Sequence, residues 1–322
     1  MRIIRGRHNI SDRDQGCVVT IGNFDGVHRG HQAILQHVKR LAEAESCEAL
    51  LICFEPQPKE FFERYQAPAR LTRFREKVTQ LSKAGIDRLL CMQFNEATRN
   101  MAVADFVQML VEELKVKALF VGDDFRFGVD RAGDFSALSA AGREFGFAVE
   151  KFSTVTQGRE RISSTLIRHC LEEGRFDEAA LLLGRPYSIM GKVVFGRQLG
   201  RTIGVPTANI QLHRYRAPIS GVYHVELQLD AQVYAGVANV GVRPTVEKGA
   251  ATPLLEVHLL GYSGDLYGRQ VEVTFLDKIR DEQKFDGLPA LKAAIEQDIA
   301  AVRLLSERQQ WEYWVSASPL CF

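Results

Sequence analysis

The stretch TIGNFDGVHRGHQAIL, residues 20–35, decides how the first part of the chain is organised. It begins inside a short apolar run, residues 17–24, whose β-branched side chains are typical of a buried strand. Gly22 and Gly26 then let the backbone turn tightly. The following segment repeats apolar residues on one helical face, at Ile34, Val38 and Leu41. The stretch therefore predicts a strand, a glycine turn and an amphipathic helix in direct succession.

The same alternation of strand and helix continues through the first half of the chain. Further apolar strand candidates occupy residues 50–56, 88–94 and 118–125, and a helical pattern occupies residues 101–114. Continuous apolar strands separated by helices indicate a parallel sheet covered on both faces. In such sheets a ligand lies beyond the carboxyl ends of the strands, where the glycine-containing segments GNFDGVHRGH and VGDDFRFG stand.

The second half follows a different period. Residues 221–229, 254–260 and 271–276 alternate apolar and polar side chains, with turn residues between them, which is typical of an antiparallel sheet or barrel. A closing helix has one apolar face, formed by Leu291, Ile295, Ile299 and Val302. The pattern changes near Arg185 and Pro186, which predicts two domains, residues 1–185 and 186–322.

Composition excludes several classes of function. The 322 residues carry 41 basic and 40 acidic side chains, a net charge of +1, so nothing indicates binding to nucleic acid or a membrane surface. No apolar run approaches the roughly 18 residues of a membrane span. The N-terminus lacks the apolar core of a signal peptide. None of the six cysteines forms a CxxC pair, which predicts reduced thiols in a cytoplasmic protein, with Cys17 and Cys53 in the core.

Two histidines stand at the start of the first helix. His28 and His31 are three residues apart, so both lie on the side of the helix where free N–H groups and the helix dipole favour an anion. The pair is suited to clamp a triphosphate and to stabilise charge in a transition state. The alternative is a pair of surface or capping histidines.

A second helix start has similar chemistry. Ser163, Ser164 and Thr165 supply hydroxyls, and Arg168 follows shortly after, which together could bind ATP phosphates. The alternative is an ordinary helix cap. Asp124, after a predicted strand, could hold Mg²⁺ or an adenosine hydroxyl, or could simply form a turn.

The second half has a glycine-rich segment of its own, GKVVFGRQLGRTIGVPTANI, residues 191–210. Its four glycines suggest a backbone cradle for phosphates, although it is not a Walker A sequence. Thr207 and Asn209 point the same way on an extended segment, where their oxygens suit Mg²⁺ that carries ATP phosphates. A plain loop is the alternative. From this segment we assign four more residues to ATP binding, Gly191, Lys192, Gly200 and Arg201.

The segment GNFDGVHRGH resembles the signature of the HxGH nucleotidyltransferase superfamily, and of its flavin adenylyltransferase branch. Three segments resemble the same branch in order: FEPQP (54–58), VGDDFRFG (121–128) and RISSTLIR (161–168). The resemblance implies that His28 and His31 bind ATP phosphates, and that the loop before them binds ATP through Gly22, Phe24 and Gly26. It also implies a flavin contact, for which flat apolar side chains are suited, at Phe54, Pro56 and Pro58.

Residues 191–210 resemble the nucleotide loop of riboflavin kinase, and the later segments LLEVHLL and DLYGRQVEVTFLDKIRDEQKF agree with that family in order. Strand alternation places Glu256 opposite to Leu255 and Val257. The resemblance implies that Glu256 is the base for the ribityl 5′-hydroxyl, whereas the alternation alone is equally typical of a solvent-facing glutamate. Arg280 is assigned to flavin or nucleotide binding.

Over residues 15–305 the chain resembles the fused prokaryotic family of bifunctional riboflavin kinase/FAD synthetases. The resemblance implies a doubly wound α/β nucleotidyltransferase domain, followed by a small antiparallel β-barrel with a terminal helix. It implies phosphorylation of riboflavin to FMN and adenylylation of FMN to FAD, with ATP and Mg²⁺, in a cytoplasmic monomer or weak homo-oligomer that binds neither nucleic acid nor membrane.

Other interpretations remain open at this point. The main one is a flavin-binding regulatory protein with an inactive kinase barrel. Another is a nucleotidyltransferase for a different phosphorylated substrate, fused to an unrelated barrel. A tRNA-related activity is disfavoured by the absence of a basic stripe.

Overall fold

A computed structural model describes residues 1–152, 155–157, 160–196, 200, 204–230, 232–244 and 251–317, without the side chains of 157, 242–244, 251–252 and 309–317. The chain forms two compact units, Met1–Leu166 and Ile167–Phe322. Residues 167–185 group with the second unit by their contacts. The predicted division into an adenylyltransferase domain, residues 1–185, and a kinase domain, residues 186–322, stays a prediction.

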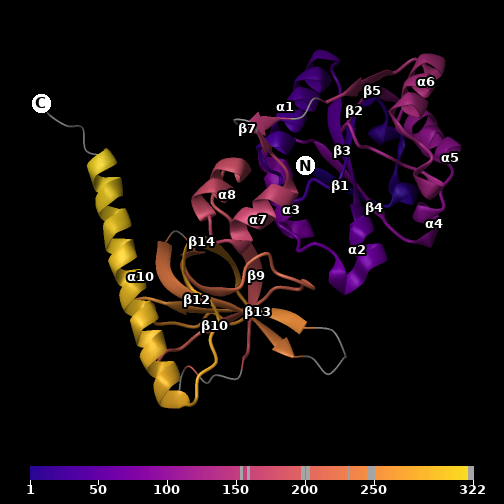
Figure 1. The fold of residues 1–322 in the computed structure, drawn as a ribbon. Coiled ribbons are helices and arrows are strands. Elements are labelled where there is room, and N and C mark those ends of the chain that lie inside the picture. Colours follow the sequence, from indigo (N-terminus) through magenta and orange to yellow (C-terminus); the bar gives the residue numbers. More distant parts are fainter. Residues whose placement is uncertain are drawn as a thin grey trace, which may run out of the picture. The chain divides into compact units, whose positions relative to one another are not determined.

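The first unit is a parallel α/β sheet with helices on both faces (Figure 1). Its strands run in the order β1-β4-β3-β2-β5-β6 and all described pairs are parallel. The strands are β1 (Arg2–Arg5), β2 (Cys17–Ile21), β3 (Glu48–Glu55), β4 (Arg88–Gln93), β5 (Val116–Val121) and β6 (Ala148–Lys151), and a separate hairpin pairs β7 (Thr156–Gln157) with β8 (Glu160–Arg161). The helices are α1 (Arg29–Ala44), α2 (Pro58–Glu63), α3 (Phe74–Lys83), α4 (Glu96–Arg99), α5 (Val103–Gln108), the π-helix η4 (Met109–Glu113) and α6 (Phe135–Phe145), with single turns η1 (Arg7–Asn9), η2 (Asp12–Asp14), η3 (Arg64–Gln66) and η5 (Val129–Arg131).

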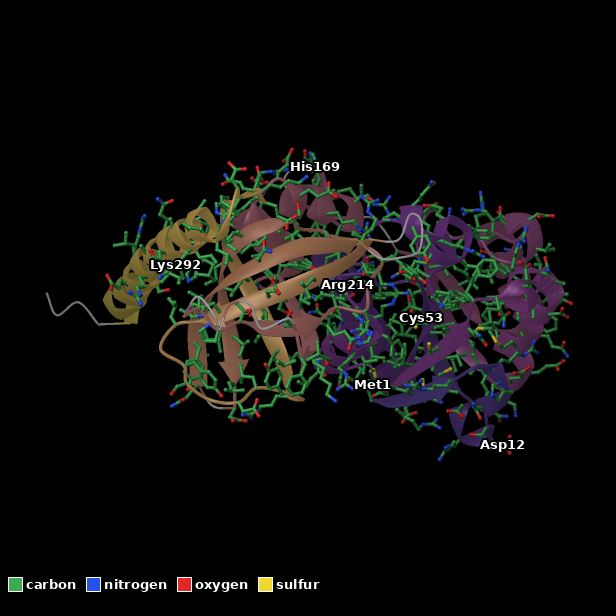
Figure 2. The ribbon with its side chains drawn as sticks, turned by 90° about the horizontal axis from the view of Figure 1, so that it is seen from below. Met1, Asp12, Cys53, His169, Arg214 and Lys292 are labelled. Carbon is green, nitrogen blue, oxygen red and sulfur yellow. The ribbon has the colours of Figure 1, made fainter. Side chains whose placement is uncertain are left out.

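Alternate residues of each strand build the two faces of this core. Val18, Leu51 and Phe120 pack under α1 and α3, whereas Val19, Ile52 and Leu119 pack under α5, η4 and α6. The cysteine prediction is confirmed, because Cys17 and Cys53 are fully buried and Cys53 (Figure 2) is a register neighbour of Cys91. The predicted strand from residue 17 ends at Ile21, earlier than expected, because positive φ values at Phe24, Gly26 and Val27 turn the chain sharply.

The strand order fixes where a ligand can enter. The chain moves from β2 through β3 to β4 on one side of β2, and then places β5 and β6 on the other. The loops after β2 and β5 therefore diverge at the carboxyl edge, which is where open α/β sheets bind their ligands. The edge strands β1 and β6 were not predicted, since their four-residue sequences are too short and charged for a clear pattern.

The second unit is a closed six-stranded barrel in the order β10-β13-β12-β11-β14-β9, with antiparallel neighbours. Its strands are β9 (Ser188–Val194), β10 (Ala208–Gln211), β11 (Gly221–Leu229), β12 (Gln232–Pro244), β13 (Ala251–Leu259) and β14 (Gln270–Arg280). Its helices are α7 (Ser164–Glu172), which begins in the first unit, α8 (Phe176–Leu183) and α10 (Leu288–Ala317).

The predicted apolar face of the last helix is confirmed. In Figure 1, α10 runs alongside the barrel, where Ile299 and Val302 pack on Val222 and Val237. Lys292, labelled in Figure 2, lies on the exposed side of the same helix. Among the described residues, no helix is long and apolar enough to cross a membrane.

Candidate functional site

The loop between β2 and α1 is held by a buried carboxylate. The side chain of Asp25 accepts hydrogen bonds from the backbone N–H groups of Leu71 and Thr72, at 3.1 and 2.9 Å. The Thr72 hydroxyl in turn accepts one from the backbone N–H of Gly26, at 2.9 Å. These bonds stabilise the sharp turn that delivers His28 to the helix start. Sequence reasoning did not single out Asp25, although it lies inside the quoted motif.

His28 is the N-cap of α1. Its Nδ1 accepts a hydrogen bond from the backbone N–H of His31 at 3.2 Å, and its side chain is buried. The two imidazole rings are stacked, with centroids 3.6 Å apart and planes 13° apart, and Phe24 packs on the ring of His31. Helix capping is the structural alternative to phosphate binding for this pair, and His28 does cap the helix. The cap also holds both imidazole rings at the positive end of the helix dipole.

The electrostatics of His31 favour a neutral ring. Burial, with smaller contributions from His28 and Lys77, holds the pKa of His31 well below its ordinary value. Its Nδ1 is buried and has no hydrogen-bond partner among the described residues. Buried polar atoms are normally paired, so this atom is suited to meet a ligand.

The start of α7 reaches the same loop. The Ser164 hydroxyl donates to the backbone carbonyl of Asp25 at 2.9 Å, and the Ser163 hydroxyl accepts from the backbone N–H of Leu166 at 3.2 Å. Both hydroxyls therefore have structural partners within the protein. These hydrogen bonds hold the start of α7 next to the loop that contains Asp25. Thr165 is exposed and Arg168, in the second unit, is half-buried.

Other predicted residues stand at the carboxyl ends of the strands that flank β2. Asp124 is exposed in the loop after β5, with its Oδ1 3.5 Å from where a Cβ on Gly122 would lie. Phe54 lies in β3, Pro56 follows as an exposed residue, and Pro58 is the first residue of α2. The parallel register of β3, β2 and β5 brings these loops to one edge.

One residue between the two prolines was missed. The side chain of Gln57 is buried, and its Nε2 has no hydrogen-bond partner among the described residues. A buried amide nitrogen without a partner among the described residues is a signal that only the tertiary structure provides. The first unit thus combines a helix start with a stacked histidine pair, a His31 whose pKa is lowered by burial, and flat apolar side chains at the carboxyl edge of the sheet.

The second unit brings together a different set. Glu256 on β13 is directly opposite Asn209 on β10 and directly opposite Asn239 on β12. Leu255 and Val257 are buried in the barrel, whereas Glu256 is partly exposed on the outer face, as the alternation predicts. Asn209 is buried on that face, and Asn239 is a further polar residue there that sequence reasoning missed.

Two described glycines of the glycine-rich segment, Gly196 and Gly200, pack closely on Asn209 and near Thr207. A Cβ on Gly196 would lie 2.3 Å from Nδ2 of Asn209. A Cβ on Gly200 would lie 2.2 Å from the carbonyl oxygen of Val205 and 3.4 Å from Oγ1 of Thr207. Gly196 therefore lies against the Asn209 side chain, and Gly200 lies close to Thr207. A hydroxyl and an amide oxygen beneath glycine backbone fit a magnesium ion that carries phosphates.

Three other residues predicted to bind ATP or flavin lie in surroundings unlike those of Thr207 and Asn209. A fourth, Arg201, lies outside the described residues. Gly191 lies within β9, where a Cβ would meet Ile210 Cγ2 at 2.3 Å, so it has a packing role there. Lys192 is exposed in the same strand. Arg280 donates to the Asp298 carboxylate at 2.8 and 2.9 Å and lies over the ring of Phe285.

The chain is similar to known proteins along nearly its whole length. Residues 10–166 match the FAD synthetase family and residues 183–305 match the riboflavin kinase family. The bifunctional riboflavin kinase/FMN adenylyltransferase of Pseudomonas fluorescens is 50% identical over 307 residues, which cover 95% of this chain and 98% of that protein. The protein of the same name from Escherichia coli K12 is 48% identical over 306 residues, 94% of this chain and 97% of its own.

A solved structure shares the architecture. The crystal structure of a Streptococcus pneumoniae protein described as a macrolide-efflux protein matches with a TM-score of 0.79 and 29% identity, over 94% of this chain and 99% of that one. The arrangement of an α/β unit followed by a barrel is therefore shared with a protein of another description.

Proposed function

The chain belongs to the family of bifunctional riboflavin kinases/FMN adenylyltransferases, and we propose that the two reactions of this family take place at the two groups of residues described above. It phosphorylates riboflavin to FMN with ATP, and adenylylates FMN to FAD with release of pyrophosphate. The residue assignment is supported by the division of the chain into two compact units, one with the stacked pair His28 and His31 and the other with Asn209 opposite Glu256.

We assign the kinase step to the outer face of the barrel. Glu256 accepts the proton of the ribityl 5′-hydroxyl as its oxygen attacks the γ-phosphorus of ATP, and ADP leaves. Asn209 lies directly opposite Glu256, so a nucleotide held by Thr207 and Asn209 presents its terminal phosphate next to the base. Lys192, Gly200 and Arg201 stay proposed ATP contacts, and Arg280 a proposed flavin contact.

Thr207 and Asn209 are the proposed magnesium ligands of the protein. These oxygens would hold the ion together with phosphate oxygens, and the bound ion would offset charge on the transferring phosphoryl group. Among the described residues there is no cluster of three metal-ligating His, Cys, Asp or Glu side chains, so the nucleotide itself would complete the coordination.

We assign the adenylyl transfer to the crevice at the carboxyl end of β2. A phosphate oxygen of FMN attacks the α-phosphorus of ATP, and pyrophosphate leaves. The FMN phosphate is already a nucleophile, so the site needs charge stabilisation rather than a base. His28 and His31 supply it, with the glycine loop (Gly22, Phe24, Gly26), Asp124 and the α7 start (Ser163, Ser164, Thr165) around the nucleotide. Arg168, which groups with the second unit, stays a prediction from the family resemblance. Phe54, Pro56 and Pro58 contact the flavin ring.

We further propose that both reactions take place in the cytoplasm, in a monomer or weak homo-oligomer that uses neither nucleic acid nor membrane. The five described cysteines are free thiols, which suits a reducing compartment. The near-balanced charge of the chain offers no attraction to polyanions.

The test is chromatography of flavins after the full chain is incubated with riboflavin, ATP and Mg²⁺. Wild type should yield FAD, and His28→Ala should stop at FMN. Glu256→Gln should make little FMN yet convert supplied FMN to FAD, because its lesion lies in the other unit. If Glu256→Gln phosphorylates riboflavin at the wild-type rate, the kinase assignment is wrong.

A further inference from the structure

Two cysteines lie side by side in the sheet of the first unit. Cys53 of β3 is the register neighbour of Cys91 of β4, and side chains of register neighbours project from the same face of a sheet. Both pack in the apolar layer under α1 and α3, where Cys53 (labelled in Figure 2) is fully buried and Cys91 is partly exposed. Neither cysteine takes part in the two proposed reactions.

The spacing of the pair suits a covalent link. Neighbouring strands of a sheet are ~4.8 Å apart, which lies within the ~4.4–6.8 Å between the Cα atoms of a disulfide. Both cysteines are free thiols in the structure, and their side chains already interact, because the Cys53 thiol donates a hydrogen bond to the Cys91 sulfur. A disulfide therefore requires little rearrangement of the sheet.

The surroundings make Cys91 the more reactive thiol of the two. The hydrogen bond from Cys53 is the largest cause that holds the pKa of Cys91 below its ordinary value. The cations of Lys77 and Arg5 lower this pKa further, whereas burial and the carboxylate of Glu55 oppose them. Arg5 of β1 is the register neighbour of Cys91 on its other side. A thiolate attacks electrophiles and a thiol does not, so Cys91 is suited to react first and Cys53 to react second.

Two further cysteines of the first unit provide an internal comparison. Cys17 packs on the opposite face of the sheet, and burial raises its pKa to about 12. Cys47 packs on the face under α1 and α3, and burial raises its pKa as well. Cys17 and Cys47 thus lie on opposite faces, and neither has the lowered pKa that favours a thiolate.

We propose that Cys53 and Cys91 form a thiol modification site, at which a hydroperoxide oxidises the pair to a reversible disulfide. The Cys91 thiolate attacks the peroxide, so that an S–O bond forms, the O–O bond breaks, and the leaving oxygen takes up a proton as water or an alcohol. The Cys53 sulfur then attacks the sulfenic acid, so that the S–S bond forms, the S–O bond breaks, and hydroxide leaves as water with the Cys53 proton. The pair loses two electrons to the peroxide, and a dithiol reductant returns them with two protons.

The test treats the reduced full chain with hydrogen peroxide, blocks the remaining thiols with N-ethylmaleimide, and identifies linked peptides by mass spectrometry. All samples carry Cys321→Ser, because that thiol lies outside the described residues. A peptide that links Cys53 to Cys91 should form, and dithiothreitol should remove the link. Cys91 should lose its thiol ~10-fold or more faster than Cys47, since the pKa of Cys91 is lowered and that of Cys47 is raised.

Two variants separate the roles of the two thiols. Cys53→Ala removes the second thiol, so dimedone should label a sulfenic acid at Cys91, formed more slowly than in wild type because the hydrogen bond from Cys53 is lost. Cys91→Ser removes the thiolate, so Cys53 should stay a thiol. Cys47→Ser is the matched control and should form the disulfide at the wild-type rate. Circular dichroism before oxidation reports whether each variant is folded.

Wild type alone decides the outcome if a variant fails to fold. If Cys53 and Cys91 keep their thiols while free cysteine in the same solution is oxidised to completion, the proposal is wrong. Oxidation of Cys91 without a link to Cys53 also overturns it. A disulfide between Cys17 and Cys47 that forms as fast would show that the register of Cys53 and Cys91 confers no selectivity, and would overturn it equally.

Discussion

The imidazole of His28 caps the first helix through its Nδ1, and lies parallel to the imidazole of His31 with 3.6 Å between the ring centroids. A single residue thus ends the glycine turn, starts the helix and forms one wall of the proposed phosphate site. His28 thus has an observed capping role and a proposed role in phosphate binding, and a suitable substitution can separate the two.

We expect His28→Asn and His28→Ala to differ in stability and not in catalysis. An asparagine oxygen can accept the His31 N–H as an N-cap, whereas alanine cannot, so only His28→Ala should lose about 1 kcal/mol of unfolding free energy. Both should lower FMN adenylylation ~100-fold or more, because charge stabilisation of the leaving pyrophosphate is lost. Denaturant unfolding and FAD formation from supplied FMN check this. Riboflavin kinase activity is the internal control, and adenylylation restored by asparagine would contradict the phosphate role.

We expect His31 to be neutral throughout the physiological pH range. Its pKa is held well below the ordinary value of 6.5 by burial, so the unfolded chain binds this proton more readily than the folded one. The contribution of His31 to stability is therefore lost as pH falls below 6.5, by up to ~1.4 kcal/mol per pH unit. NMR titration of the imidazole signals, with His31→Gln to identify the signal, measures the pKa directly. A midpoint at 6.5 or above would be incompatible with this burial.

Alanine substitutions at two glycines of the second unit should distinguish an effect on packing from an effect on metal binding. Gly191→Ala places a Cβ against Ile210 and the backbone oxygen of Gln211, so it should destabilise the barrel by about 1–3 kcal/mol. In Gly196→Ala the three atoms nearest to the new Cβ are all in the terminal amide of Asn209, at 2.3 to 2.6 Å. This substitution should raise the Mg²⁺ concentration for half-maximal kinase activity ~10-fold with little change in melting temperature. Equal Mg²⁺ dependence in Gly196→Ala and wild type would remove Asn209 from the metal site.

Arg280 should contribute to stability through Asp298. The guanidinium donates two hydrogen bonds to this buried carboxylate of α10, so Arg280→Gln and Asp298→Asn should each cost about 3 kcal/mol. Thermal unfolding of both variants measures the loss. A rise in riboflavin KM confined to Arg280→Gln would support its proposed flavin contact in addition. Unchanged stability in both variants would mean that the ion pair does not anchor α10.

The fold could be predicted where the apolar pattern was strong. The central strands β2 to β5 are buried on both faces, so their residues form continuous apolar runs, and the long strands of the barrel alternate because one face is exposed. The edge strands β1 and β6 escaped prediction because burial imposes little pattern on them. The end of β2 was misplaced because positive φ values at Phe24 and Val27 cannot be read from apolar periodicity.

The site could be predicted only in part, for a similar reason. His28, His31 and Glu256 belong to recognisable local motifs, and their proposed roles come from the resemblance of these motifs to known families. The surroundings of Asp25, Gln57 and Asn239 cannot be read from spacing, although Asp25 and Gln57 lie inside quoted segments. Asp25 gains its structural role from Thr72, far along the chain, and Asn239 gains its place from its register with Glu256.

By itself the sequence determined the kind of protein: an α/β unit with a histidine pair at a helix start, a following β unit, and the residue types needed for phosphate chemistry. Periodicity and motif spacing are local properties, and the sequence displays them directly. Only the tertiary structure decided which polar groups face one another, such as Asn209, Glu256 and Asn239 across three strands. Strand order and register depend on contacts between segments distant in sequence, so no local pattern specifies them.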